Sequence, residues 1–191
     1  LANAAVPPLR FSDVAGTLEE YVQELHALES GKRSNTATLT QLLEDGVFKL
    51  ATDPVTPVAA PPREEPVPYL NLAPLDNAVA ALKRSASAYD AAYAKALAKG
   101  MRPDAKLDAL LQGMEPSFTD AQGLPGRDWY RHLIYAPGLL TGYGVKTLPG
   151  VREAIDARKW DDADKYAVLT ARAIERYTAR LDEATALLAK P

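Results

Sequence analysis

The stretch that decides the fold class lies near the end of the chain, where residues 161–188 read DDADKYAVLTARAIERYTARLDEATALL. Its apolar and small side chains recur every three or four positions, which is the spacing of one face of an α-helix. The acidic start suits the positive end of a helix dipole, and we expect Asp161 or Asp162 to cap this helix. The side chains predicted to face a core are those of Tyr166, Thr170, Ile174, Tyr177, Leu181 and Leu188.

The first 51 residues show the same helical period. Ser12 is predicted to cap a helix that ends at Gly31, and residues 36–51 are predicted to form a second helix with Gly46 as an unfavourable interior residue. The apolar stripe of the first helix comprises Val14, Leu18, Tyr21, Val22, Leu25 and Leu28; that of the second comprises Leu39, Leu42, Leu43 and Leu50.

Prolines mark the starts of further helices, because the first turn of a helix tolerates proline. We expect one helix from Pro74 to Gly100, another from Pro103, and a short one after Pro149. Their predicted core residues are Leu75, Val79, Leu82, Ala86, Tyr89, Tyr93 and Leu97, followed by Leu107, Leu110, Leu111, Met114 and Phe118.

Two segments interrupt this helical pattern. Seven of the 15 prolines lie between positions 54 and 74, so residues 52–74 cannot be helical. Apolar residues near the end of this segment predict an extended strap along a helical surface, with a mobile middle. Residues 119–150 hold six of the 11 glycines and form a long loop region.

These elements together predict an all-α fold. We expect a bundle of about four long helices with additional short helices, the proline-rich strap and a long ordered loop. At 191 residues the chain is about the length of one domain, so residues 1–191 are assigned to a single domain. The first residue is Leu1 and not methionine, and we expect the chain to be part of a longer polypeptide.

Composition excludes several function classes. The net charge of −3 and the pI of about 5.5 argue against a nucleic-acid partner. The absence of cysteine excludes thiol chemistry, and no apolar stretch is long enough for a membrane span. The only histidines, His26 and His132, lack metal-ligand spacing, and the serines lack a nucleophile motif. We therefore expect no catalytic residue, metal site or cofactor in this chain.

The segment 123–137, GLPGRDWYRHLIYAP, mixes charged and aromatic residues between glycine and proline turns. We interpret it as an ordered loop built over the core. Arg131 and His132 are expected to satisfy buried carbonyl groups. The remaining structural loop residues are Arg127, Trp129, Tyr130 and Tyr135, and the three aromatic side chains are expected to pack.

This run, with Tyr143 and the Leu148–Pro149–Gly150 turn after it, resembles the C-terminal helical domain of glutamate carboxypeptidase-like zinc peptidases, known as the transferrin-receptor-like dimerisation domain. The resemblance is strongest over residues 115–188 and weaker near residues 6–11. The strap and the 36–51 helix look like an insertion relative to animal carboxypeptidases, and residues 66–75 are similar to bacterial members.

The resemblance implies a non-catalytic role for this chain within a larger protein. It implies homodimerisation through one helical face, for which we prefer the last helix together with the one near Leu75. It also implies a peptidase domain on the same polypeptide that holds two zinc ions, and a loop here that closes one side of the substrate cleft. Bacterial relatives favour export to the periplasm or the medium, although the compartment stays open. A free-standing helical module that binds a protein or a small ligand is the alternative function.

The same resemblance singles out substrate contacts in the loop. Glutamate-selective members carry adjacent lysine and tyrosine residues there, and these positions fall on Gly142 and Tyr143. Tyr143 is therefore a candidate contact to the α-carboxylate of a substrate. Because Gly142 lacks the lysine charge, we expect the parent enzyme not to select C-terminal glutamate, unless Lys146 replaces that charge.

Overall fold

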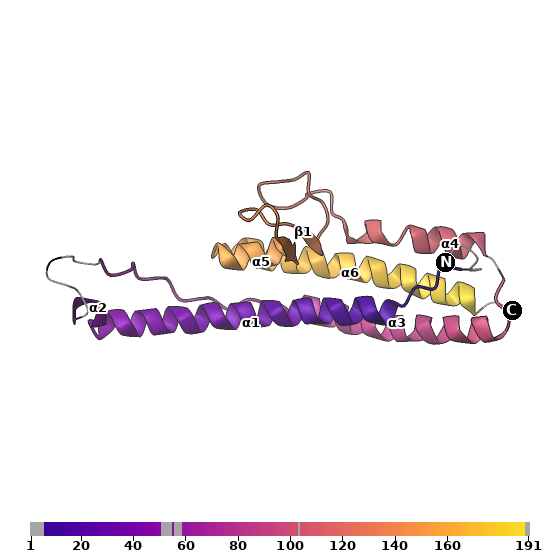
Figure 1. The fold of residues 1–191 in the computed structure, drawn as a ribbon, viewed down its shortest axis with the longest axis horizontal. Coiled ribbons are helices and arrows are strands. Elements are labelled where there is room, and N and C mark those ends of the chain that lie inside the picture. Colours follow the sequence, from indigo (N-terminus) through magenta and orange to yellow (C-terminus); the bar gives the residue numbers. More distant parts are fainter. Residues whose placement is uncertain (1–5, 51–54, 56–58, 103, 190–191) are drawn as a thin grey trace.

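The computed structural model describes residues 6–50, 55, 59–102 and 104–189 and confirms the all-α fold class (Figure 1). The helices are α1 (Phe11–Glu44), α2 (Val47–Leu50), α3 (Ala73–Ala98), α4 (Ala105–Gln112), α5 (Pro149–Asp156) and α6 (Trp160–Leu188), with a 3₁₀ turn η1 (Glu115–Phe118). Two short strands, β1 (Tyr135–Pro137) and β2 (Val145–Thr147), form an antiparallel hairpin within the loop region.

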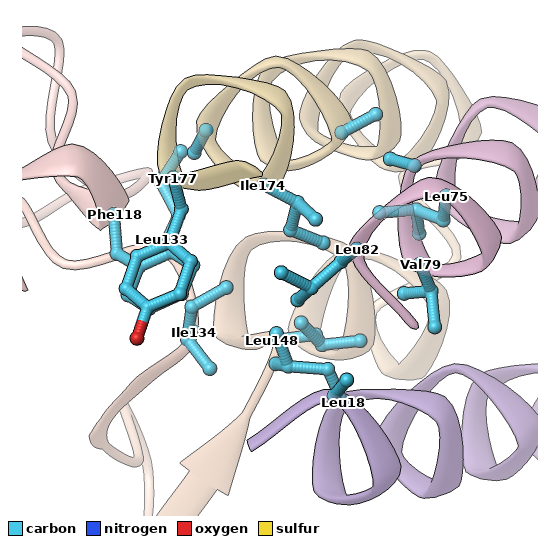
Figure 2. Close-up of a cluster of buried hydrophobic side chains, with 14 of the residues drawn as sticks. Leu18, Leu75, Val79, Leu82, Phe118, Leu133, Ile134, Leu148, Ile174 and Tyr177 are labelled. Carbon is cyan, nitrogen blue, oxygen red and sulfur yellow. The ribbon is translucent and has the colours of Figure 1, made fainter. Parts of the chain in front are cut away.

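Helix α6 is the central element of the bundle. Small side chains such as Ala163, Ala167 and Ala171 let the neighbouring elements approach it closely, and Ile174 and Leu181 are fully buried among them. Helices α3, α4 and α5 and the η1 turn all pack against it, and α1 packs against α3 on the outer side (Figure 1). One continuous apolar core results, and Figure 2 shows part of it around Leu82 and Ile174.

The prediction that Gly31 ends the first helix is wrong. Helix α1 continues through Gly31 to Glu44, and the break comes at Gly46, whose φ of +67° suits glycine. The separate 36–51 helix is thus the end of α1 followed by the single turn α2. Arg33 helps to hold this second half in place, since its guanidinium group donates to the carbonyl oxygens of Val67 and Pro68 in the strap.

Both predicted capping residues are also wrong. The residue before α1 is Arg10, and the carboxylate of Asp90 on α3 accepts hydrogen bonds from the backbone N–H groups of Phe11 and Ser12 at 3.0 and 3.2 Å. A side chain 78 positions away therefore satisfies the free donors, and the Ser12 hydroxyl itself donates to Asp90. Helix α6 starts after Lys159 without a side-chain cap, so Asp161 lies inside its first turn.

The prolines predict the starts of helices better than the expected capping residues do. Pro74 and Pro149 both occupy the first turn of their helices, as expected, whereas Pro103 lies outside the described residues. Helix α4 is capped instead by Asp104, whose carboxylate accepts from the N–H groups of Lys106 and Leu107.

The strap runs beside the last part of α1, without regular secondary structure from residue 59 to residue 72 (Figure 1). Val67, Leu70 and Leu72 are buried, which confirms that its end packs on the helices. Arg158 fixes the strap further by donating to the Glu64 carboxylate at 2.8 Å and to the Glu65 carbonyl oxygen. The predicted mobile middle falls mainly on residues outside the described ranges.

Candidate functional site

The loop region 119–148 gathers on one side of the bundle, next to α5 and the start of α6 (Figure 1). Within it, β1 and β2 pair with Ala136 opposite Lys146, and residues 138–144 form the connecting turn. Backbone hydrogen bonds close this turn, from Gly138 N–H to the Gly144 carbonyl oxygen at 2.8 Å and from Gly142 N–H to the Gly138 carbonyl oxygen at 3.0 Å. The turn therefore has a defined shape although it protrudes.

The predicted substrate contacts lie at the tip of this turn. The side chain of Tyr143 is fully exposed and contacts no core residue. Gly142 beside it has a φ of +61°, and a Cβ atom there would meet open space. Lys146 lies apart from them on β2, with its side-chain stem next to Gly138. The structure thus keeps Gly142 and Tyr143 together at the tip and places Lys146 at the base of the turn.

A buried ion pair anchors the base of the turn. Arg127 is 4% exposed, and its guanidinium group donates to the Glu153 carboxylate on α5 at 2.6 Å and to the Pro137 carbonyl oxygen. The other Glu153 oxygen accepts from the Leu139 N–H group at 2.8 Å. Pro137 at the end of β1 is therefore connected to α5 through Arg127, and Leu139 is connected to α5 directly. Sequence reasoning named Arg127 as structural but missed Glu153, which looks like any other helical glutamate.

A second polar cluster shapes the entry to β1. The Glu115 carboxylate oxygen Oε1 accepts from the Tyr135 hydroxyl at 2.6 Å and contacts His132 Nε2 at 3.0 Å. The backbone N–H groups of Ile134 and Tyr135 donate to His132 Nδ1, so Nε2 carries the ring proton and donates to Glu115. The hydrogen bond to Glu115 raises the pKa of Tyr135. His132 thus satisfies backbone N–H groups, and not the carbonyl groups that we expected.

The aromatic loop residues differ from the expected packing. Trp129 is 71% exposed, Tyr130 is 36% exposed and contacts Trp129, and Tyr135 is 49% exposed. Arg131 is exposed as well. The expected packing is therefore confirmed only in part: the Tyr135 ring packs on His132 and the Tyr130 ring on Arg127, whereas Trp129 faces outward. An aromatic residue that faces outward has the same sequence signature as one that faces inward, and the pattern gave no way to separate them.

The outer face of α3 is the other candidate surface. Its exposed residues include several alanines, interspersed with the charged side chains of Lys83, Arg84 and Lys95; the alanines are Ala80, Ala88, Ala91, Ala94 and Ala98. In contrast, α6 uses its apolar face against the rest of the bundle, and Val168 is its one large exposed apolar residue among those described. Of the two helices named for a twofold face, α3 therefore exposes more alanine side chains than α6 does.

Within the described ranges, no group of three acidic, histidine or cysteine residues is placed to hold a metal ion. In the same part of the chain, none of the helices combines the length and the hydropathy needed to cross a bilayer.

Comparison with known proteins identifies the family. A family profile described as "Transferrin receptor-like dimerisation domain" matches residues 70–182, which is more than half of the chain. The chain belongs to this transferrin receptor-like dimerisation family. The match covers α3, α4, the whole loop region, α5 and most of α6, while α1 and most of the strap lie outside it.

Several curated proteins are similar to a part of this transferrin receptor-like domain. A probable glutamate carboxypeptidase of Arthroderma benhamiae is 41% identical over 68 residues, or 36% of this chain, and one of Arabidopsis thaliana is 44% identical over 61 residues, or 32%. An inactive zinc metalloprotease of Schizosaccharomyces pombe is 36% identical over 69 residues, or 36% of this chain. Each match spans 9% of the length of the relative.

Proposed function

We propose that this transferrin receptor-like domain is the non-catalytic homodimerisation part of a larger, zinc-dependent carboxypeptidase-like protein, and that its loop region lines one side of the substrate cleft. Two relatives are named as probable glutamate carboxypeptidases, and one is named as an inactive metalloprotease. The zinc ions would belong to the peptidase part, since the described residues offer no ligand set.

The observation that carries this proposal is the distribution of exposed apolar side chains. Of the large apolar residues that are exposed in the described ranges, half lie between positions 129 and 145. Such a concentration on one surface marks a contact with another part of a protein. The residues are Trp129, Tyr130, Tyr135, Leu139, Leu140, Tyr143 and Val145.

The encoding reading frame tests the peptidase part of the proposal directly. We expect a peptidase domain with ligands for two zinc ions upstream of Leu1 on the same polypeptide. A frame in which this domain stands alone would overturn the proposal in favour of the free-standing binding module.

Dimerisation is tested by sedimentation of the chain with one charge placed on the outer face of α3. Small side chains allow a second helix to approach, and a twofold axis that passes near the middle of the exposed alanines would bring Ala91 of both copies close together. We expect Ala91→Glu to shift the chain from dimer to monomer, because two buried like charges then oppose each other. Ala37→Glu, at an exposed alanine of α1, is the matched control and should leave the dimer intact.

Substrate selection is tested in the full-length protein. Tyr143→Phe removes one hydroxyl contact to the substrate carboxylate, and we expect kcat/KM to fall by about tenfold. Gly142→Lys has space for its side chain, although the positive φ costs about 1 kcal/mol. We expect it to increase the preference for C-terminal glutamate. A strong glutamate preference of the unmodified protein that survives Lys146→Ala would contradict the role assigned to Gly142.

A further inference from the structure

A surface cavity of about 380 Å³ lies between the first turns of α1, the η1 turn and β1. It is separate from the tip of the 138–144 turn, since no residue of that turn lines it. Its walls include the aromatic rings of Tyr21, Phe118, Tyr135 and Tyr177 together with aliphatic side chains. The proposed function assigns no role to this cavity.

The cavity is negatively charged. Asp13 and Glu115 line it, whereas none of its lining residues in the described part of the chain is a lysine or an arginine. Glu115 uses one oxygen, Oε1, for both His132 and Tyr135, so its Oε2 atom has no partner within the described ranges. The Asp13 carboxylate likewise has no hydrogen bond or ion pair to any residue that the structure describes.

The hydroxyl group of a largely buried tyrosine also opens into this cavity. Tyr177 is 4% exposed, its ring stacks on Phe118 with 4.2 Å between the ring centres, and burial raises the pKa of its hydroxyl. Its ring projects from α6, with the oxygen directed away from Ile174 and Leu82 (Figure 2). Since Tyr177 lines the cavity and its hydroxyl is bonded to none of the described residues, this oxygen is free to accept a hydrogen bond from a ligand.

We propose that this cavity binds an organic cation, namely an alkylammonium or alkylguanidinium group on an apolar stem. The carboxylates of Asp13 and Glu115 attract the charge, and the Tyr177 hydroxyl oxygen accepts one N–H group. The electron-rich faces of the aromatic rings stabilise a cation further. The aliphatic and aromatic walls receive the stem, and the volume is that of a small ligand pocket.

Titration of the 191-residue chain with butylammonium tests this proposal, with backbone amide NMR signals of Leu18 and Ile134 as reporters. We expect saturable shifts with butylammonium and with butylguanidinium. The uncharged, similarly shaped n-pentanol should give shifts only at concentrations at least about tenfold higher, because it lacks the charge. Equal affinity for n-pentanol would overturn the proposal, as would the absence of shifts with either cation.

Two variants locate the site. Asp13→Asn should weaken butylammonium binding about fivefold or more, and Tyr177→Phe about threefold or more, because each removes one polar contact. Glu20→Gln is the matched control, since it removes an exposed charge from the same helix outside the cavity. Equal weakening by Asp13→Asn and Glu20→Gln would overturn the proposal, because binding would then depend on general charge. Unchanged NMR spectra of the free variants verify their folding.

The cation can belong to a free amine or to a basic side chain of a protein segment. Titration with Nα-acetyl-lysine methylamide separates these sources. Tighter binding than butylammonium indicates contacts to a peptide backbone, and weaker binding indicates a free amine; both results require the cation site. Binding that persists in the Asp13→Asn/Glu115→Gln double variant would contradict it.

Discussion

The seam between α3 and α6 and the loop region 119–148 differ in which side chains they bury and which they expose. In the seam, Leu75, Leu82, Ile174 and Leu181 are fully buried, and apolar contact alone holds the helices together. In the loop region, Leu124, Leu133 and Leu148 are also buried, but seven large apolar side chains between positions 129 and 145 are exposed while the charged side chain of Arg127 is buried. Besides the Arg127–Glu153 pair, the Tyr166 hydroxyl donates to the Gly123 carbonyl oxygen at 2.7 Å within the core.

This difference separates the residues that stabilise the fold from those that are exposed for contact with another surface. Apolar burial is non-directional and supplies most of the folding free energy, so the seam tolerates no large loss of volume. Buried hydrogen bonds are directional, and together with the buried side chains of Leu124, Leu133 and Leu148 they fix the course of the loop backbone. The loop region can therefore keep a defined shape while it offers its apolar residues to another surface.

The largest effect should come from a cavity in the seam. Leu82→Ala is expected to lower the free energy of unfolding by about 2–5 kcal/mol, because Leu82 is fully buried between packed helices. Leu140→Ala removes the same atoms from a side chain that is 96% exposed, and should change it by about 0.5 kcal/mol or less. Urea denaturation at a fixed protein concentration measures both. Equal effects would break the distinction between the two regions.

Loss of the loop anchor should be the next largest effect. Glu153→Gln leaves the Arg127 charge buried without its counter-charge, and we expect a loss of about 1–3 kcal/mol. Hydrogen exchange of the Leu139 amide should also become faster, since Glu153 is its acceptor. Glu175→Gln, at an exposed glutamate of α6, is the control. A stability loss without faster exchange at Leu139 would show that the pair does not shape the turn.

The cap of α1 comes third. Asp90→Ala removes the acceptor for the N–H groups of Phe11 and Ser12 and should cost about 1–2 kcal/mol. Asp161→Ala, at one of the caps that the sequence suggested, should cost less than about 1 kcal/mol, because this carboxylate only interacts with the helix dipole. Thermal unfolding of both variants measures the difference, and a larger effect at Asp161 would restore the sequence-based assignment.

The smallest predicted effect is a pH dependence of stability that comes from the buried Tyr177 on α6. Burial raises the pKa of Tyr177 above its ordinary value of 10.0, so the unfolded chain loses this proton first as the pH rises. The free energy of unfolding should therefore fall above pH 10, by about 1 kcal/mol per pH unit for this group. Tyr177→Phe should reduce that slope. Tyr143→Phe should not, because this side chain is exposed in the folded chain as well.

Helical periodicity predicted the bundle correctly because core positions repeat along the sequence. Leu75, Val79, Leu82, Ala86 and Tyr89 are all buried, as their spacing indicated. Near the end of the same stripe, Leu97 is 59% exposed, because the apolar spacing continues beyond the part of α3 that packs against the bundle.

Other features depend on partners that are distant in sequence. Ser12 looks like a cap, but the tertiary contact with Asp90 supplies the acceptor. Gly31 looks like a helix end, but contacts between Arg33 and the strap hold α1 beyond it. In the candidate site, the sequence motif located the loop and its tip. The anchoring role of Glu153 and the exposure of the aromatic rings depend on the folded structure and could not be predicted from the motif.

The unbroken course of α1 has a mechanical consequence. At 1.5 Å per residue, its 34 residues form a rod of about 51 Å, and the last part, beyond Gly31, extends past α3 with the strap alongside (Figure 1). Arg158 connects that part to the turn between α5 and α6 through a hydrogen bond to Thr36. The part of α1 beyond Gly31 is therefore held to the bundle by hydrogen bonds to Arg158 and to the strap, although it extends beyond the end of α3.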